Sequence, residues 1–272
     1  VDRGVELLDT SFQAMIITNN GDNFSVGANL VLLLAAAQTE DFDGIDLMIR
    51  HFQQSMLRLK YAPRPVVSAV FSRALGGGCE IVLQSHRVQA SAETYIGLVE
   101  VGVGLIPSAG GCKEMVLRYP DSLEAFEVIG QGKVSGSAEE ARQLRFLNAA
   151  DRISMNPELL IGEAQQFAIE LAADYSPGAP RLDIPAGGEP AYAKMRLAAW
   201  SARESGWISN HDFVIGEKLA YVLSGGRVTA GSKISEQHLL DLEREAFLSL
   251  CGMRQTQQRI EYMLKNGKPL RN

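Results

Sequence analysis

The stretch Ala74-Leu-Gly-Gly-Gly-Cys-Glu80 places a run of glycines two residues before a glutamate. The residues before it, 66–71, are mostly apolar and rich in valine, and residues 79–84 after it are suited to a helix. Glycine turns expose backbone N–H groups that can hold a developing oxyanion, and a helix N-terminus adds favourable potential. The stretch therefore predicts a buried strand, a tight turn lined by N–H donors, and a helix with an acid in its first turn.

Two further glycine turns accompany this unit. Upstream lies Phe24-Ser-Val-Gly-Ala-Asn29, and downstream Val99-Glu100 precedes Gly104-Leu-Ile-Pro-Ser-Ala-Gly-Gly111. Glu80 and Glu100 both lie in apolar surroundings, which tend to raise the pKa of a carboxyl group and suit it to proton transfer near neutral pH. The plainer alternatives are an acid on a helix surface, a solvated loop acid and an ordinary tight turn.

In this order the three stretches resemble the signature of the crotonase, or enoyl-CoA hydratase/isomerase, superfamily. The matching elements are F-x-x-G-A-D, A-x-G-G-G-x-E and P-E-x-x-x-G-x-x-P-x-x-G-G, and they occur here within residues 24–29, 65–80 and 99–111. Three linked motifs are far more specific than one glycine string. The resemblance implies an α/β fold, a crotonase-like ββα spiral with a C-terminal helical region.

The resemblance also implies a role for each motif residue. The N–H groups of Ala28 and Gly77 are expected to form an oxyanion hole for a thioester oxygen. Glu80 is expected to activate water at C3, and Glu100 to protonate C2. The backbone N–H of Ser108 is expected to help position that water.

The chain departs from the family pattern at three of these positions. Val99 replaces the proline of P-E, Ser108 replaces a glycine, and Asn29 replaces the aspartate of G-A-D with no lysine nearby. Because several relatives carry a basic residue just after that aspartate for coenzyme A phosphates, Lys60 or Arg64 would have to substitute here. Both are equally consistent with ordinary surface charges.

Because both acids are present, the resemblance favours hydration of a 2-trans-enoyl-CoA to a 3-hydroxyacyl-CoA in fatty-acid β-oxidation. One alternative is an isomerase, which commonly retains only the acid of the P-E motif. Another is a catalytically weak acyl-CoA-binding or assembly domain of a larger multifunctional protein. Acyl-CoA is the expected ligand, and no metal or redox cofactor is expected in this segment.

Residues 240–248 and 268–272 resemble the C-terminal region of fused 3-hydroxyacyl-CoA dehydrogenase/enoyl-CoA hydratase polypeptides. The chain has no initiator Met, and residues 1–8 already have a helical pattern, so we expect it to begin inside a longer protein. NAD would serve only a dehydrogenase domain outside this segment, since no Gly-x-Gly-x-x-Gly follows a strand here. The expected protein partners are the N-terminal domains of such a polypeptide or further copies of this chain.

The composition and the spacing of particular residues argue against several classes of protein. The net charge of -6 argues against a nucleic-acid binder, and no stretch approaches the length of a membrane span. The three cysteines show no metal-ligand spacing, which favours a reducing, cytoplasmic location without disulfides. None of the 4 histidines pairs with another at a metal-ligand spacing.

Alternating short strands and helices predict an α/β class for the first part of the chain. We expect residues 1–175 to form the crotonase-like core, residues 176–190 a linker or surface loop, and residues 190–272 the helical region. The expected strands are residues 12–18, 66–71, 87–90 and 94–96, and the main expected helices are residues 28–37, 45–59, 79–84, 157–173, 192–204, 212–223 and 236–251.

Overall fold

The computed structural model describes residues 1–8 and 10–272, which form two compact units that interleave along the chain. Unit 1 comprises Val1–Gly27, Phe52–Leu98 and Val134–Pro180, and unit 2 comprises Ala28–His51, Val99–Lys133 and Arg181–Asn272. One long helix, α3 (Phe42–Lys60), contributes residues to both units. The division into residues 1–175 and 190–272 stays a prediction.

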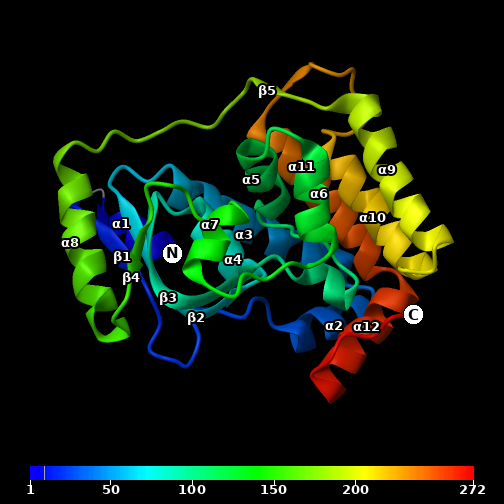
Figure 1. The fold of residues 1–272 in the computed structure, drawn as a ribbon, viewed down its shortest axis with the longest axis horizontal. Helices are drawn as coiled ribbons and strands as arrows, with labels where there is room; N and C mark the ends of the chain where they lie inside the picture. The colour runs from blue at the N-terminus through cyan, green and yellow to red at the C-terminus, as the bar shows by residue number, and fades with distance from the viewer. Residues whose placement is uncertain (9) are drawn as a thin grey trace. The chain divides into compact units, whose positions relative to one another are not determined.

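Unit 1 is built on a parallel four-stranded sheet (Figure 1). Its strands lie in the order β1 (Met15–Ile17), β2 (Val66–Leu75), β3 (Arg87–Gly97) and β4 (Arg152–Ser154). The first part of β2 is completely buried, as the continuous apolar run from Val66 predicts for a strand covered on both faces. This parallel sheet with its helices confirms the expected α/β class.

Three of the strands predicted from the sequence have wrong bounds, and one of these is β2, which continues to Leu75 instead of ending at residue 71. β1 is shorter than residues 12–18, and Phe12 is 56% exposed. β3 is one continuous strand, although residues 87–90 and 94–96 were predicted to form two separate strands. Ser91 instead pairs with Ser154 of β4, and the pairing of β3 with β2 shifts register between Val70 and Ser72.

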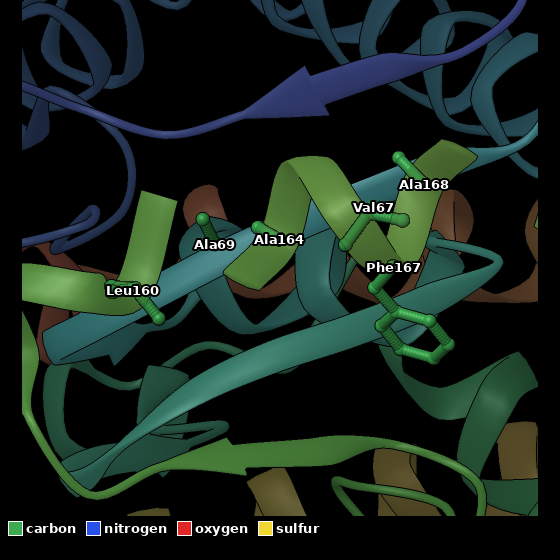
Figure 2. Packing of buried hydrophobic residues seen from close by; sticks show 6 residues of the cluster. All are labelled: Val67, Ala69, Leu160, Ala164, Phe167 and Ala168. Carbon is green, nitrogen blue, oxygen red and sulfur yellow. The ribbon is translucent and has the colours of Figure 1, made fainter. Parts of the chain in front are cut away.

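The helix α8 (Leu160–Ala173) packs against β2, preceded by the short turn η2 (Pro157–Leu159). Figure 2 shows the contact, in which side chains of α8 lie over Val67 and Ala69 of β2. The buried residues of α8 are spaced three or four positions apart, so they lie on one face of the helix. They are Leu160, Ala164, Phe167 and Ala168. The two small alanines allow the helix to approach the sheet closely.

Unit 1 also contains α1 (Asp2–Leu8), α4 (Gly77–Gln84) and α7 (Ala138–Gln143). The residues Ser137-Ala-Glu-Glu140 have the sequence pattern of a capping box at the start of α7, but only half of the box forms. The Ser137 hydroxyl accepts from the Glu140 N–H at 3.1 Å, but the Glu140 carboxylate accepts from the N–H of Gly136 at 2.7 Å. The helix begins where the sequence predicts, with a different partner for the acid.

His86 is a satisfied core histidine in unit 1. Its Nδ1 accepts from the Val66 N–H at 2.9 Å, so Nε2 carries the proton and donates to the Tyr175 hydroxyl. That hydroxyl in turn donates to the Ala62 carbonyl at 3.0 Å. Burial lowers the pKa of His86 to about 4. Burial therefore keeps the ring neutral, and the hydrogen bonds to Val66 and Tyr175 fix its tautomer.

The lowered pKa predicts a pH-dependent loss of stability. The unfolded chain binds the proton more readily than the folded one, so the stabilisation is present above the ordinary pKa of 6.5 and is lost as the pH falls from there to about 4. We expect His86→Asn, which retains an acceptor but cannot titrate, to lose less stability than the wild type between pH 7 and pH 4.5. Urea unfolding at both pH values measures this, and parallel losses would contradict it.

Unit 2 is mostly helical. Its helices include α10 (Asn210–Leu223), which contacts α9 (Gly188–Glu204), α6 (Ser122–Gly130) and α11 (Glu236–Cys251). The remaining elements are α2 (Leu30–Gln38), η1 (Glu100–Val103), α5 (Gly111–Arg118), α12 (Arg254–Asn266) and the antiparallel pair β5 (Ile184–Pro185) and β6 (Lys233–Ile234). β5 and the start of α9 occupy the segment expected to be a linker. No helix in the described residues combines the length and apolarity needed to cross a membrane.

Several large apolar side chains of unit 2 are exposed. Val31 and Leu32 of α2 are 58% and 66% exposed, while Leu33 and Leu34 are buried. The apolar residues of α2 therefore cover more than its packed face. Trp200 and Trp207 are also exposed.

Candidate active site

The glycine turn joins β2 to α4 in unit 1. Gly76 has φ 57° and ψ -126°, and it forms the N-cap of α4 without a side-chain hydrogen bond. Its N–H donates to the Gly97 carbonyl at 2.9 Å, which ties the turn to the end of β3. Since α4 begins at Gly77, the backbone of Gly77 lies at the positive end of that helix.

Close backbone packing explains the glycines that follow. A Cβ added to Gly78 would lie 2.5 Å from the Ser25 carbonyl oxygen, a distance that cannot be relieved by a flexible side chain. A Cβ on Gly77 would lie 3.2 Å from the Phe52 ring. The turn is therefore packed against the segment that carries Ser25.

Gly27 continues this segment and also packs against the turn. It has φ 95°, and an added Cβ would lie 3.4 Å from the Gly77 nitrogen. The segment is held in register because the Leu75 N–H donates to the Ser25 carbonyl at 2.9 Å. Ala28 is the next residue in the chain, so its N–H belongs to the peptide bond that begins at Gly27.

Glu80 lies in the first turn of α4 and is only 2% exposed. Its backbone N–H donates to the Gly76 carbonyl at 3.0 Å. The burial argues against the alternative of an acid on a helix surface. A buried carboxyl group near a helix N-terminus is a candidate catalytic group rather than a solvated surface acid.

In unit 2, Asn29 is the N-cap of α2, which begins at Leu30. Its side-chain oxygen accepts from the N–H groups of Val31 at 3.0 Å and Leu32 at 3.3 Å. The residue that departs from the aspartate of the family pattern therefore serves as the N-cap of α2. Ala28, directly before it, is exposed.

Glu100 is the first residue of η1 and is half-buried. Its carbonyl accepts from the Leu105 N–H at 3.0 Å, and Gly104, with φ 85°, ends the turn. Thr256 of α12 donates its hydroxyl to the Gly104 carbonyl at 2.9 Å. The turn that carries Glu100 is thus held in place by a helix far away in the sequence.

Ser108 lies between Glu100 and the start of α5, in a segment that is otherwise buried. Gly110, with φ 107°, is the N-cap of α5 and has no side-chain hydrogen bond of its own. A buried carboxylate from α11, that of Glu243, accepts the Gly110 N–H at 2.7 Å. Glu243 could not be identified from the sequence, because no local pattern marks an acid in the middle of a helix as a cap for another helix.

The structure brings Gly77 and Glu80 together on α4 of unit 1, and it places Ala28, Glu100 and Ser108 in unit 2. Glu100 and Ser108 share one short segment. The pairing of Ala28 with Gly77, and of Glu80 with Glu100, stays a prediction from the motifs.

The two basic candidates for a phosphate contact, Lys60 and Arg64, both lie in unit 1. Arg64 is exposed, and the Lys60 ammonium lies 5.5 Å from the centroid of the Tyr61 ring. Among the described residues, no cluster of three or more His, Cys, Asp and Glu side chains could hold a metal ion. His211 and His238 hydrogen-bond to Thr256 and to the Gly225 carbonyl at 2.9 Å and 3.0 Å.

Comparison with known proteins gives one family. The sequence model described as enoyl-CoA hydratase/isomerase matches residues 6–150. A probable 3-hydroxyacyl-CoA dehydrogenase of Bacillus subtilis is 43% identical over 100% of this chain and 36% of its own length. A putative fatty acid oxidation complex trifunctional enzyme of Rickettsia felis is 29% identical over 92% of this chain and 33% of its own length. The chain thus spans about a third of these curated relatives.

A solved structure shares the fold. An enoyl-CoA hydratase/isomerase from Mycobacterium paratuberculosis matches 96% of this chain and 83% of its own, with a TM-score of 0.62 and 22% identity. At that identity the likeness shows the fold alone, and it confirms the expected crotonase-like architecture.

Proposed function

The chain belongs to the enoyl-CoA hydratase/isomerase family, and we propose that it hydrates a 2-trans-enoyl-CoA to a 3-hydroxyacyl-CoA. The observation that carries this proposal is Glu80, buried to 2% exposure in the first turn of α4 directly after the glycine turn. A one-base isomerisation needs only the acid that corresponds to Glu100. A second acid in this position supports a reaction that handles water.

In the proposed mechanism, Glu80 removes a proton from water as its oxygen attacks C3, and Glu100 supplies a proton to C2. Negative charge develops on the thioester oxygen, and the N–H groups of Ala28 and Gly77 stabilise it. Each preorganised donor of this kind typically lowers the barrier by about 3 kcal/mol. The backbone N–H of Ser108 holds the water between the acids.

Hydration leaves the overall oxidation state unchanged, so the proposed reaction needs no redox cofactor in this segment. The names of the relatives support a place in fatty-acid β-oxidation, with this segment as the hydratase part of a longer polypeptide. Its product, a 3-hydroxyacyl-CoA, is what a 3-hydroxyacyl-CoA dehydrogenase oxidises with NAD. The three cysteines are buried thiols that form no disulfide, which supports a reducing, cytoplasmic compartment.

The test is incubation of the protein with crotonyl-CoA. We expect loss of the ultraviolet absorbance of the conjugated thioester and a mass increase of one water in the product. Conversion of a 3-enoyl-CoA to the 2-enoyl-CoA without hydration would instead identify an isomerase. Binding of acyl-CoA with neither reaction would favour the binding or assembly domain.

A further inference from the structure

Glu243 of α11 caps a helix to which it is not adjacent in sequence. Its carboxylate accepts the Gly110 N–H at 2.7 Å through Oε2 and the Lys113 N–H at 2.6 Å through Oε1. The side chain is completely buried. Gly110 is the N-cap of α5 and Lys113 lies in its first turn. At this end of a helix the backbone N–H groups lack partners within the helix. Gly110 supplies no side-chain cap, so Glu243 takes over that role.

A buried charge network surrounds this contact. The Lys113 ammonium lies 2.7 Å from Glu114 and 2.9 Å from Glu236, and all these side chains are almost completely buried. Burial acts to lower the pKa of Lys113, but the carboxylates of Glu114 and Glu236 outweigh it and raise the pKa. Glu236 also accepts the Arg181 N–H at 3.2 Å. Glu236 thus belongs to the same network through its contact with the Lys113 ammonium, whereas Glu243 accepts the N–H groups of Gly110 and Lys113.

The segment that carries Ser108, residues 100–110, is also anchored at its N-terminal end. Besides the Thr256 contact, Arg259 of α12 donates to the Val101 carbonyl at 3.5 Å and to Asp212 at 2.6 Å. The residues between Glu100 and Gly110 are therefore fixed by α12 at one end and by α11 at the other. Ser108 lies two residues from the Glu243 anchor, so movement of Gly110 displaces the Ser108 backbone directly.

We propose that Glu243 is a positioning residue for hydration, which fixes the backbone around Ser108 and hence the water that this backbone holds. The inference rests on the proposed function. Because one buried carboxylate accepts two backbone hydrogen bonds, it restricts both the position and the direction of the segment that ends at Gly110. A displacement of about 1 Å in such a segment can reduce turnover about a hundredfold, because the attack geometry is lost.

The experiment compares Glu243→Gln with the matched control Glu236→Gln. The glutamine at 243 offers one acceptor and turns an N–H donor toward the second backbone N–H, so the double anchor is broken. We expect kcat for crotonyl-CoA to fall between about 10- and 100-fold, with KM within about threefold of the wild type. Glu236→Gln, which removes a carboxylate from the same network, should keep kcat within about threefold. Glu243→Asp, shorter by one methylene, should not restore kcat.

Amide hydrogen exchange gives a second readout that needs no activity. A peptide covering residues 105–113 should exchange faster in Glu243→Gln than in Glu236→Gln at equal global stability. Unchanged kcat in Glu243→Gln, or equal losses in both variants, would overturn the positioning role. If the wild type fails to hydrate crotonyl-CoA, the proposed function fails, and equal exchange in the two variants would then separately refute the anchoring.

Discussion

Glu80→Gln and Glu100→Gln should each lower the rate of crotonyl-CoA hydration by at least about a hundredfold, the usual scale for loss of a positioned acid or base. Glutamine preserves the shape of the side chain but cannot exchange a proton in the same way. Because Glu80 is only 2% exposed, its replacement also changes a buried polar group, so thermal unfolding must accompany the kinetics. Near-native turnover in either variant would remove that residue from the mechanism.

The two variants should differ when a 3-enoyl-CoA is the substrate. If the chain also isomerises, Glu100→Gln should abolish both reactions, whereas Glu80→Gln should reduce hydration alone. Glu163→Gln is a suitable control in unit 1, since its carboxylate bonds to Gln89 and Ser154 of the sheet and has no assigned role. Turnover by this variant should match the wild type.

Lys113→Met should destabilise the protein by about 3–5 kcal/mol, because it leaves the carboxylates of Glu114 and Glu236 buried without their shared cation. The free energy of unfolding in urea measures this loss. Adding Glu236→Gln to Lys113→Met should recover part of it, since one of the uncompensated charges is then removed.

Lys194→Met provides the comparison. Lys194 pairs with Asp121 at 2.7 Å, but the two side chains are 53% and 45% exposed. Exposed pairs of this kind contribute about 0–1 kcal/mol, so the variant should unfold almost like the wild type. Equal effects at the two lysines would contradict the importance of the buried network.

Local features of the fold could be predicted from the sequence, and contacts between distant segments could not. The turn before Glu80 follows from adjacent glycines, and α11 begins and ends where its pattern predicts. The continuous strand β3 was missed because Ser91 pairs with Ser154, a partner that no local pattern reveals.

In the candidate site, too, only the residues inside local motifs could be predicted from the sequence. Glu80, Glu100 and Ser108 were found because each lies inside a short motif. Glu243 lies 133 residues from its partner Gly110, and nothing near it marks the contact. The exposed face of α2 was missed because Val31 and Leu32 are as apolar as their buried neighbours, so the sequence contains no periodicity to distinguish them.

The interleaved order of the two units has a consequence during synthesis on the ribosome. Unit 1 has all of its segments only once Pro180 has been translated, whereas unit 2 begins at Ala28 and still requires Arg181–Asn272. Glu100 and Ser108 therefore emerge long before α11 and α12 exist to anchor them. The nascent chain must keep the apolar residues of that segment from aggregating until more than a hundred later residues have been added, which makes this stretch a candidate for chaperone binding.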